Sequence, residues 1–172
     1  FLYVGRIIKR KNIEALINKF NTIFYNKDAV LRIVGDGEYY NNFKNKYASD
    51  QVIFTGKLID SGLVHEFHNA SCLVCPSIFE PWGLVVNEAL SAGLPVIVSK
   101  EVGACYDLIE GRDTGFVFES DNEMGDRMLQ IFNNNKLLNT YSKNAILLMK
   151  NYWNYDLYLN SLNLVIHEFK NK

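Results

Sequence analysis

The sequence has little of the features that would place it at once in several classes of protein. Its 172 residues include only 3 prolines and 3 cysteines, and the formal net charge is −1. No apolar run reaches the ~18 residues that a membrane-spanning helix needs. With 48% apolar residues, this composition argues against a disordered chain, a disulfide-stabilised secreted domain and a dedicated nucleic-acid-binding protein. The odd number of cysteines, without disulfide-framework spacing, favours a reducing, cytoplasmic compartment.

The start of the chain suggests a fragment. Phe1 stands where an initiator methionine would be, and it leads directly into apolar residues that are typical of a strand. At ~100–200 residues per domain, the length fits a single domain. We therefore expect residues 1–172 to form one domain that was cut at a domain boundary.

Short apolar runs alternate with amphipathic stretches along most of the chain. The runs predict strands at Phe1–Val4, Leu31–Val34, Val52–Phe54, Cys72–Cys75, Val96–Val98 and Phe116–Phe118. The stretches between them predict helices at Asn12–Phe24, Glu38–Ala48, Ser61–Asn69, Gly83–Ala92 and Ala104–Glu110. Because the runs are apolar throughout rather than alternating, the strands should be covered on both faces, as in a parallel sheet. Repeated strand–helix units predict an open α/β sheet that binds ligands beyond the carboxyl ends of its strands.

The C-terminal part, from about residue 121 to residue 172, shows only helical patterns. Helices are predicted at Met124–Phe132, Leu137–Lys150 and Tyr155–Phe169. The last of these follows Trp153 and carries many apolar residues, which we expect to be exposed in part, as at an interface. We assign this region to C-terminal helices of the same domain.

The loop after the first predicted strand is rich in basic residues. Four of them, including Arg6 and Lys11, lie between Gly5 and Asn12. Gly5 permits a ligand to approach the backbone closely, and the helix that follows offers free amides at its start. These features fit a phosphate or diphosphate, while a solvated basic turn is an equal alternative.

Glycines also follow the next two predicted strands. Gly35 and Gly37 flank Asp36 after the second strand, and Lys57–Leu58 follow a glycine after the third. A Gly-x-Gly sequence without a third glycine is a weak dinucleotide fingerprint, and Asp-Gly is also a common turn. These loops therefore permit ligand contact without requiring it.

The most informative segment spans residues 76–90, after the fourth predicted strand. Gly83 and Leu84 stand at the predicted start of a helix, where free amides and the helix dipole favour an anion. Glu88 follows one helical turn later on the same side, and Glu80 stands at the exit of the strand. Carboxylates at these places can accept hydrogen bonds from sugar hydroxyls.

Together these segments resemble the group 1 glycosyltransferases, also called family 4. The matching residues are Val4-Gly5-Arg6 with Lys11, Gly35-Asp36-Gly37, Val52–Gly56, Pro76-Ser77, Glu80–Leu84, Glu88-Ala89 and Gly93–Ile97. The resemblance covers nearly the whole chain in the family's order, and the spaced glutamates are its signature. It implies a Rossmann-like three-layer sandwich with a mainly parallel sheet of about six strands. That sandwich would be the C-terminal, donor-binding half of the two-domain GT-B fold, without the N-terminal, acceptor-binding domain.

The resemblance also implies a role for each matching residue. Arg6 and Lys11 would hold the donor's diphosphate, Glu88 its ribose, and Glu80 would face the transferred sugar. The catalytic candidates are Glu80, Arg6 and Lys11, and no metal ligand is expected. The expected donor-binding residues are Gly5, Arg6, Gly35, Lys11, Lys57, Leu58, Glu80, Gly83, Leu84 and Glu88, with Lys57 and Leu58 beside the base.

The implied activity is the retaining transfer of a sugar from a UDP-, GDP- or ADP-sugar. The acceptor would be a surface polysaccharide, a lipid-linked sugar or a glycolipid, bound through the missing domain. No cofactor and no nucleic-acid partner is expected, and the full-length enzyme would act in the cytoplasm, peripherally associated with the inner face of the membrane. The isolated fragment should bind donor without transferring it.

Alternatives to this activity stay open. They are another GT-B enzyme, such as a nucleotide-sugar epimerase or a glycogen-type synthase or phosphorylase, and a non-catalytic nucleotide-binding module. The spacing of Glu80 and Glu88 argues against the epimerase. Trp82 stands where the family often has phenylalanine, which leaves the identity of the donor open.

Two other groups of residues are assigned structural roles. Cys72 and Cys75 have the spacing of a metal or redox pair, but they lie within an apolar run without a second pair, which favours buried thiols. His65 and His68 lie one turn apart on a predicted helix without a metalloprotease pattern, which favours surface or packing roles.

Overall fold

The computed structural model describes residues 1–170. In chain order its elements are β1 (Leu2–Val4), the 3₁₀ helix η1 (Lys9–Lys11), α1 (Ile13–Ile23), β2 (Leu31–Val34), α2 (Tyr40–Tyr47), β3 (Val52–Gly56), α3 (Asp60–Asn69), β4 (Leu73–Cys75), α4 (Leu84–Ser91), β5 (Val96–Ser99), α5 (Ala104–Leu108), β6 (Gly115–Phe118), α6 (Asp121–Asn133), α7 (Asn135–Asn151) and α8 (Tyr155–Lys170). The predicted alternation of strands and helices is confirmed. Element ends differ from the predictions by a few residues.

The strands form one sheet in the order β3-β2-β1-β4-β5-β6, and all neighbouring strands are parallel. This confirms the Rossmann-like α/β class. From β1 the sheet grows to one side through β2 and β3, and the chain then returns to the other side of β1 to form β4. The carboxyl ends of β1 and β4 therefore flank a topological switch point, where open α/β sheets bind their ligands.

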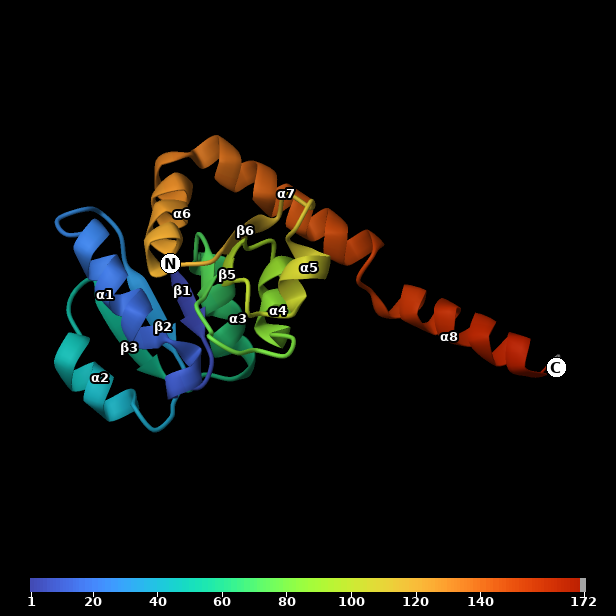
Figure 1. Cartoon of the computed structure of the whole chain (residues 1–172), viewed down its shortest axis with the longest axis horizontal. Helices are drawn as coiled ribbons and strands as arrows, with labels where there is room; N and C mark the ends of the chain where they lie inside the picture. The colour runs from blue at the N-terminus through green and yellow to red at the C-terminus, as the bar shows by residue number, and fades with distance from the viewer. Residues whose placement is uncertain (171–172) are drawn as a thin grey trace.

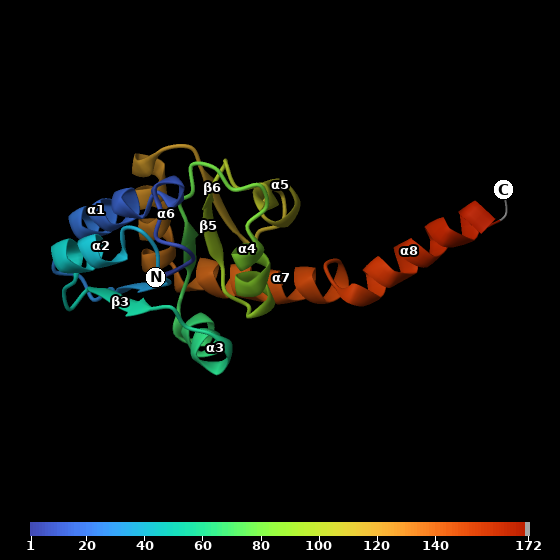
Figure 2. The same cartoon turned by 90° about the horizontal axis from the view of Figure 1, so that it is seen from below.

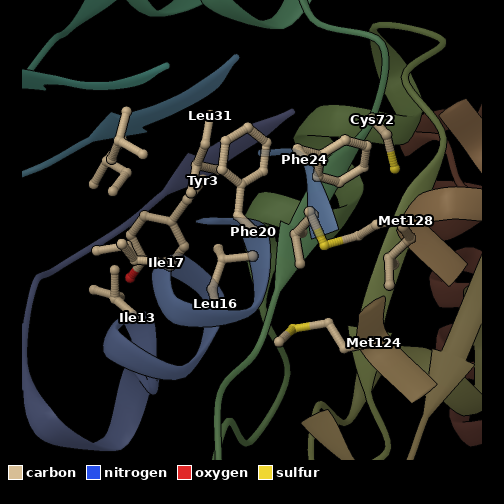
Figure 3. Packing of buried hydrophobic residues seen from close by; sticks show 14 of the residues in the cluster. Tyr3, Ile13, Leu16, Ile17, Phe20, Phe24, Leu31, Cys72, Met124 and Met128 are labelled. Atoms are coloured by element: carbon tan, nitrogen blue, oxygen red, sulfur yellow. The ribbon is translucent and has the colours of Figure 1, made fainter. Parts of the chain in front are cut away.

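Both faces of the sheet are buried, which explains the continuous apolar runs. Tyr3 and Ile33 point to the face covered by α1 and α6, and Figure 3 shows Phe20 and Met124 in this layer. Leu73, from a neighbouring strand, belongs to the opposite cluster, which includes residues of α3, α4 and α5. The result is a three-layer sandwich, visible from two directions in Figures 1 and 2.

Helix α6 begins three residues before the predicted Met124. The hydroxyl of Ser120 accepts a hydrogen bond from the backbone amide of Glu123 at 3.2 Å, and a Glu123 carboxylate oxygen accepts one from the amide of Glu119 at 2.9 Å. These two bonds satisfy backbone donors that the start of a helix would otherwise leave free. The prediction followed the apolar period and therefore started too late.

The two final helices differ in their surroundings. Helix α7 crosses the sandwich and packs Ala145 and Leu148 into the same cluster as α4. Helix α8 leaves the body of the domain and extends away from it (Figure 1), and every side chain from Tyr155 to Phe169 is exposed. Within the described residues, we find no helix with the length and apolar character required to cross a membrane.

Candidate functional site

The loops that follow β1 and β4 are joined at the switch point. The amide of Ile78 donates to the carbonyl oxygen of Arg10 at 2.9 Å, and the Arg10 guanidinium donates to the carbonyl oxygen of Phe79 at 3.4 Å. These bonds link segments that are far apart in the sequence. They hold the basic loop against the segment that contains Glu80.

Lys11 and Glu80 meet at this junction. The Lys11 ammonium donates a hydrogen bond to Oε2 of Glu80, and each side chain is only 14% exposed. Short helix η1 brings Lys11 to this position, and Asn12, with a φ of 53°, turns the chain into α1. Two of the three predicted catalytic residues are thus in direct contact, as a largely buried ion pair.

Three glycines align the ends of the first three strands. The amide of Gly5 donates to Val34 O at 3.0 Å, and the amide of Gly35 donates to Gly56 O at 2.9 Å. A Cβ atom on Gly35 would lie 1.8 Å from the carbonyl oxygen of Gly5. Only glycine fits there, so the turn after β2 can lie directly against the turn after β1.

Arg6 follows Gly5 and is exposed at this edge. The hydroxyl of the buried Tyr3 donates to the carbonyl oxygen of Arg6 at 2.9 Å. Burial raises the pKa of Tyr3 well above its usual range, so the hydroxyl stays protonated and keeps this bond. This hydrogen bond therefore fixes the backbone of Arg6, while the exposed guanidinium of Arg6 remains available to a ligand.

Glu80 is held by the loop after β5 as well. Its amide donates to Glu101 O and its carbonyl oxygen accepts from the Gly103 amide, both at 3.0 Å. Gly83 then turns the chain with a φ of 94° into α4, and a Cβ there would lie 2.9 Å from a methyl carbon of Val102. The exposed Leu84 starts α4, so the helix begins beside Glu80 at this edge of the sheet.

Glu88 lies one turn further along α4. Partial burial raises the pKa of this carboxyl, although the residue as a whole is exposed. At the far side of the same edge, exposed Lys57 and half-buried Leu58 follow Gly56 at the end of β3. All ten predicted donor-binding residues therefore lie on the loops or the helix that follow the carboxyl ends of β1, β2, β3 and β4.

Residues outside the predicted set also shape the site. Arg10 links the two central loops, Tyr3 supports Arg6, and the Trp82 indole donates to Oδ1 of Asn87 at 2.8 Å. Arg10 had a signal in the basic loop. No sequence signal marks Tyr3 or Asn87, because each acts through a hydrogen bond that no residue spacing predicts.

The residues assigned structural roles agree with that interpretation. Cys72 and Cys75 are buried, and burial raises the pKa of Cys72 to about 12. His65 and His68 are exposed on α3. Asp36 accepts a hydrogen bond from the amide of Gly37 at 2.7 Å, as in a turn. Between residues 1 and 170, no group of three or more His, Cys, Asp or Glu side chains could hold a metal ion.

A hollow of about 360 Å³ lies at the opposite edge of the sheet, near the amino ends of β1, β2 and β4. Its lining includes Phe1, Arg32 and Ser71, and none of the ten predicted donor-binding residues. The Glu66 carboxylate holds the Arg32 guanidinium through two hydrogen bonds of 2.5 Å. The hollow is therefore remote from the switch point.

The sheet order, the glycine turns and the charged switch point define a Rossmann-like ligand-binding domain. The family model described as glycosyl transferases group 1 matches residues 1–147. The sulfoquinovosyl transferase of Arabidopsis thaliana is 34% identical over 121 residues, which cover 68% of this chain and 23% of that protein. An Escherichia coli protein, UDP-Gal:alpha-D-GlcNAc-diphosphoundecaprenol alpha-1,3-galactosyltransferase, is 32% identical over 153 residues, or 84% of this chain and 39% of its own.

Among solved structures, sucrose-phosphate synthase from Thermosynechococcus elongatus matches with a TM-score of 0.83 and 26% identity, over 99% of this chain and 45% of that one. The chain therefore belongs to the group 1 glycosyl transferases, and it corresponds to the C-terminal domain of these GT-B enzymes. It spans less than half the length of each of these three proteins.

Proposed function

We propose that this chain is the donor-binding part of a glycosyltransferase that uses a nucleotide-diphosphate sugar and retains the configuration of the transferred sugar. The observation that carries the proposal is the meeting of Lys11, Glu80 and the start of α4 at the switch point. Binding of a sugar diphosphate would use positive charge, a carboxylate and the first amides of a helix, and this combination supports the proposal.

The proposed chemistry depends on the charge that develops as the sugar leaves its nucleotide. Cleavage of the sugar–phosphate bond leaves a nucleoside diphosphate with increasing negative charge on the bridging oxygen. Arg6, Lys11 and the amides of Gly83 and Leu84 would stabilise this charge in the transition state more than in the ground state. In this role, the protein supplies fixed positive groups to the leaving group.

Glu80 and Lys11 neutralise each other in the chain without donor. An incoming diphosphate would add a second anionic partner for the Lys11 ammonium, which has three donor hydrogens. Glu80 would then keep one hydrogen bond from Lys11 and offer its other oxygen to a hydroxyl of the sugar. Its position between β4 and α4 supports a sugar-facing role.

The nucleoside would extend along the remaining part of the edge. Glu88, as a carboxylate, would accept hydrogen bonds from the ribose hydroxyls. The backbone at Gly35 and at Lys57–Leu58 would border the base. UDP, GDP and ADP all carry the diphosphate and ribose that these groups recognise.

The acceptor would bind to a part of the protein outside this chain. The two sequence relatives carry names that specify transfer of a galactose from UDP-Gal to a diphosphoundecaprenol-linked sugar and transfer of a sulfoquinovosyl group. By analogy we assign a surface polysaccharide, a lipid-linked sugar or a glycolipid as acceptor here, with action in the cytoplasm at the inner face of the membrane. The 172-residue chain alone should bind donor and should not transfer it.

Isothermal titration calorimetry of UDP, GDP and ADP tests the proposal. We expect at least one nucleotide to bind, and Arg6→Ala and Glu88→Ala to weaken its binding at least tenfold, about 1.4 kcal/mol. Arg112→Ala and Glu110→Ala are matched controls, because both residues are exposed in the loop after α5. Absence of binding, or equal effects of the site and control variants, would contradict the assignment.

A further inference from the structure

The only two tryptophans of the sequence contact each other. The ring centroids of Trp82 and Trp153 are 5.4 Å apart, and the rings are tilted by 36°. Trp82 lies in the loop between Glu80 and Gly83, and Trp153 lies in the connection between α7 and α8. The contact therefore joins the candidate sugar site to the segment from which α8 departs.

Trp82 is already fixed on two other sides. Its indole N–H donates to Oδ1 of Asn87 in α4 at 2.8 Å, and its carbonyl oxygen accepts from the Ala104 amide at the start of α5 at 2.9 Å. Trp153 supplies the third support and is itself 38% exposed. Trp153 can therefore be substituted without opening a cavity in the hydrophobic core.

The position of Trp153 depends on α7. Its amide donates to the carbonyl oxygen of Leu148 at 3.3 Å, and Leu148 packs in the same cluster as Val86 and Leu90 of α4. Beyond this point α8 extends away from the body of the domain (Figure 2). A shift of the α7–α8 connection would therefore reach the Glu80–Leu84 loop through one ring contact.

We propose that Trp153 is a positioning residue for the donor sugar, because its ring holds Trp82 and thereby the Glu80–Leu84 loop. This inference rests on the proposed function and deepens it. Arg6, which would hold the diphosphate, belongs to the loop after β1, and Glu88, which would hold the ribose, belongs to α4, so neither lies in the Glu80–Leu84 loop. Lys11 is connected to that loop through its ion pair with Glu80. Loss of the Trp153 ring should therefore weaken binding of the sugar nucleotide more than binding of the nucleoside diphosphate.

The first experiment compares each nucleotide with its sugar conjugate: UDP with UDP-glucose, GDP with GDP-mannose and ADP with ADP-glucose. An aromatic pair contributes enough for an expected loss of about two- to tenfold in affinity. In Trp153→Ala, the affinity for the bound sugar nucleotide should fall by this factor relative to the affinity for its nucleoside diphosphate. Trp153→Phe should restore the wild-type ratio of the two affinities. Tyr155→Ala, at a residue that is 85% exposed, should leave both affinities unchanged.

The second experiment needs no ligand. Amide hydrogen exchange in the Glu80–Leu84 segment should become faster in Trp153→Ala and stay unchanged in Tyr155→Ala. The far-ultraviolet exciton couplet of the two indoles in circular dichroism should vanish in Trp153→Phe. This variant keeps an aromatic contact, so exchange should remain slow in it. Unchanged exchange in Trp153→Ala would overturn the positioning role.

The outcomes separate the two proposals. If the wild-type chain binds none of the six compounds, the proposed function fails and the positioning role fails with it. If it binds, but Trp153→Ala leaves the ratio of the two affinities unchanged, only the positioning role fails. Equal weakening of both ligands would also overturn it, because such a result indicates a general structural effect.

Discussion

Replacing Gly35 with alanine perturbs the point where the turns after β1 and β2 touch. The new Cβ would lie 1.8 Å from the carbonyl oxygen of Gly5, and the backbone at Gly35 has a φ of +140°, which L side chains rarely adopt. The contact partner is backbone, so no side-chain rotation can relieve it. Two hydrogen bonds at this junction, from Gly5 to Val34 and from Gly35 to Gly56, would have to lengthen.

The expected loss of stability is the sum of the backbone strain and the weakening of the two hydrogen bonds. Backbone strain of this kind costs ~1–3 kcal/mol, and each weakened hydrogen bond costs ~0.5–1.5 kcal/mol. We expect the free energy of unfolding to fall by ~2–6 kcal/mol, which corresponds to a decrease in Tm of about 4–24 °C for a domain of this size. Nucleotide affinity should fall as well, because Gly5 and Arg6 would move.

Urea unfolding followed by circular dichroism measures the effect, and Gly111→Ala is the matched control. Gly111 also has a positive φ, of +67°, but a Cβ there meets no atom within 4 Å. Its replacement should cost only about 1–2 kcal/mol, the cost of a left-handed conformation. Equal shifts of the urea midpoint in the two variants, at unchanged slope, would refute the close-approach argument.

Three further predictions concern the charged and thiol groups. Burial raises the pKa of Glu88, so as pH falls its carboxylate takes up a proton earlier than an ordinary glutamate, and nucleotide affinity should decline from that higher pH. Glu88→Gln should remove this pH dependence in calorimetric titrations, and persistence of the decline would assign it to another group. Lys11→Ala leaves the Glu80 carboxylate, 14% exposed, without its counter-ion and should lower the free energy of unfolding by ~1–3 kcal/mol, the cost of a buried polar group that loses its partner. Lys9→Ala, at an exposed position, should stay within ~0.5 kcal/mol in the same urea assay, and similar values for both would contradict a stabilising pair. All three cysteines are buried, and the pKa of Cys72 is raised to about 12, so Ellman's reagent should label them only after unfolding; rapid labelling of the native chain would show that they are accessible.

The fold could be predicted because burial on both faces produces a simple pattern. The Val96–Val98 run is apolar throughout because β5 is covered on both sides, and its buried pattern is complete. The start of α6 was also encoded, in Ser120 and Glu123, but the apolar period alone does not reveal it. The order of the strands in the sheet could not be predicted in this way, because no local pattern specifies which strand pairs with β1.

The candidate site was predictable as a set of loops but not as a geometry. Gly83, Glu80 and Glu88 could be selected because a strand exit, a turn and a helix start coincide in one segment. The contact of Lys11 with Glu80 joins residues separated by 69 positions, and it arises from the return of the chain beside β1. The contact of Trp82 with Trp153 is equally remote in sequence, so only the folded chain reveals it.

The central claim is that a nucleotide-diphosphate sugar binds at the carboxyl ends of β1 and β4. Its most direct test is a map of amide chemical-shift changes on addition of UDP, GDP or ADP to the isotope-labelled chain. The account predicts that the largest changes occur at Gly5, Arg6, Gly35 and Gly83. Changes confined to the hollow at the opposite edge, beside Arg32, would contradict it.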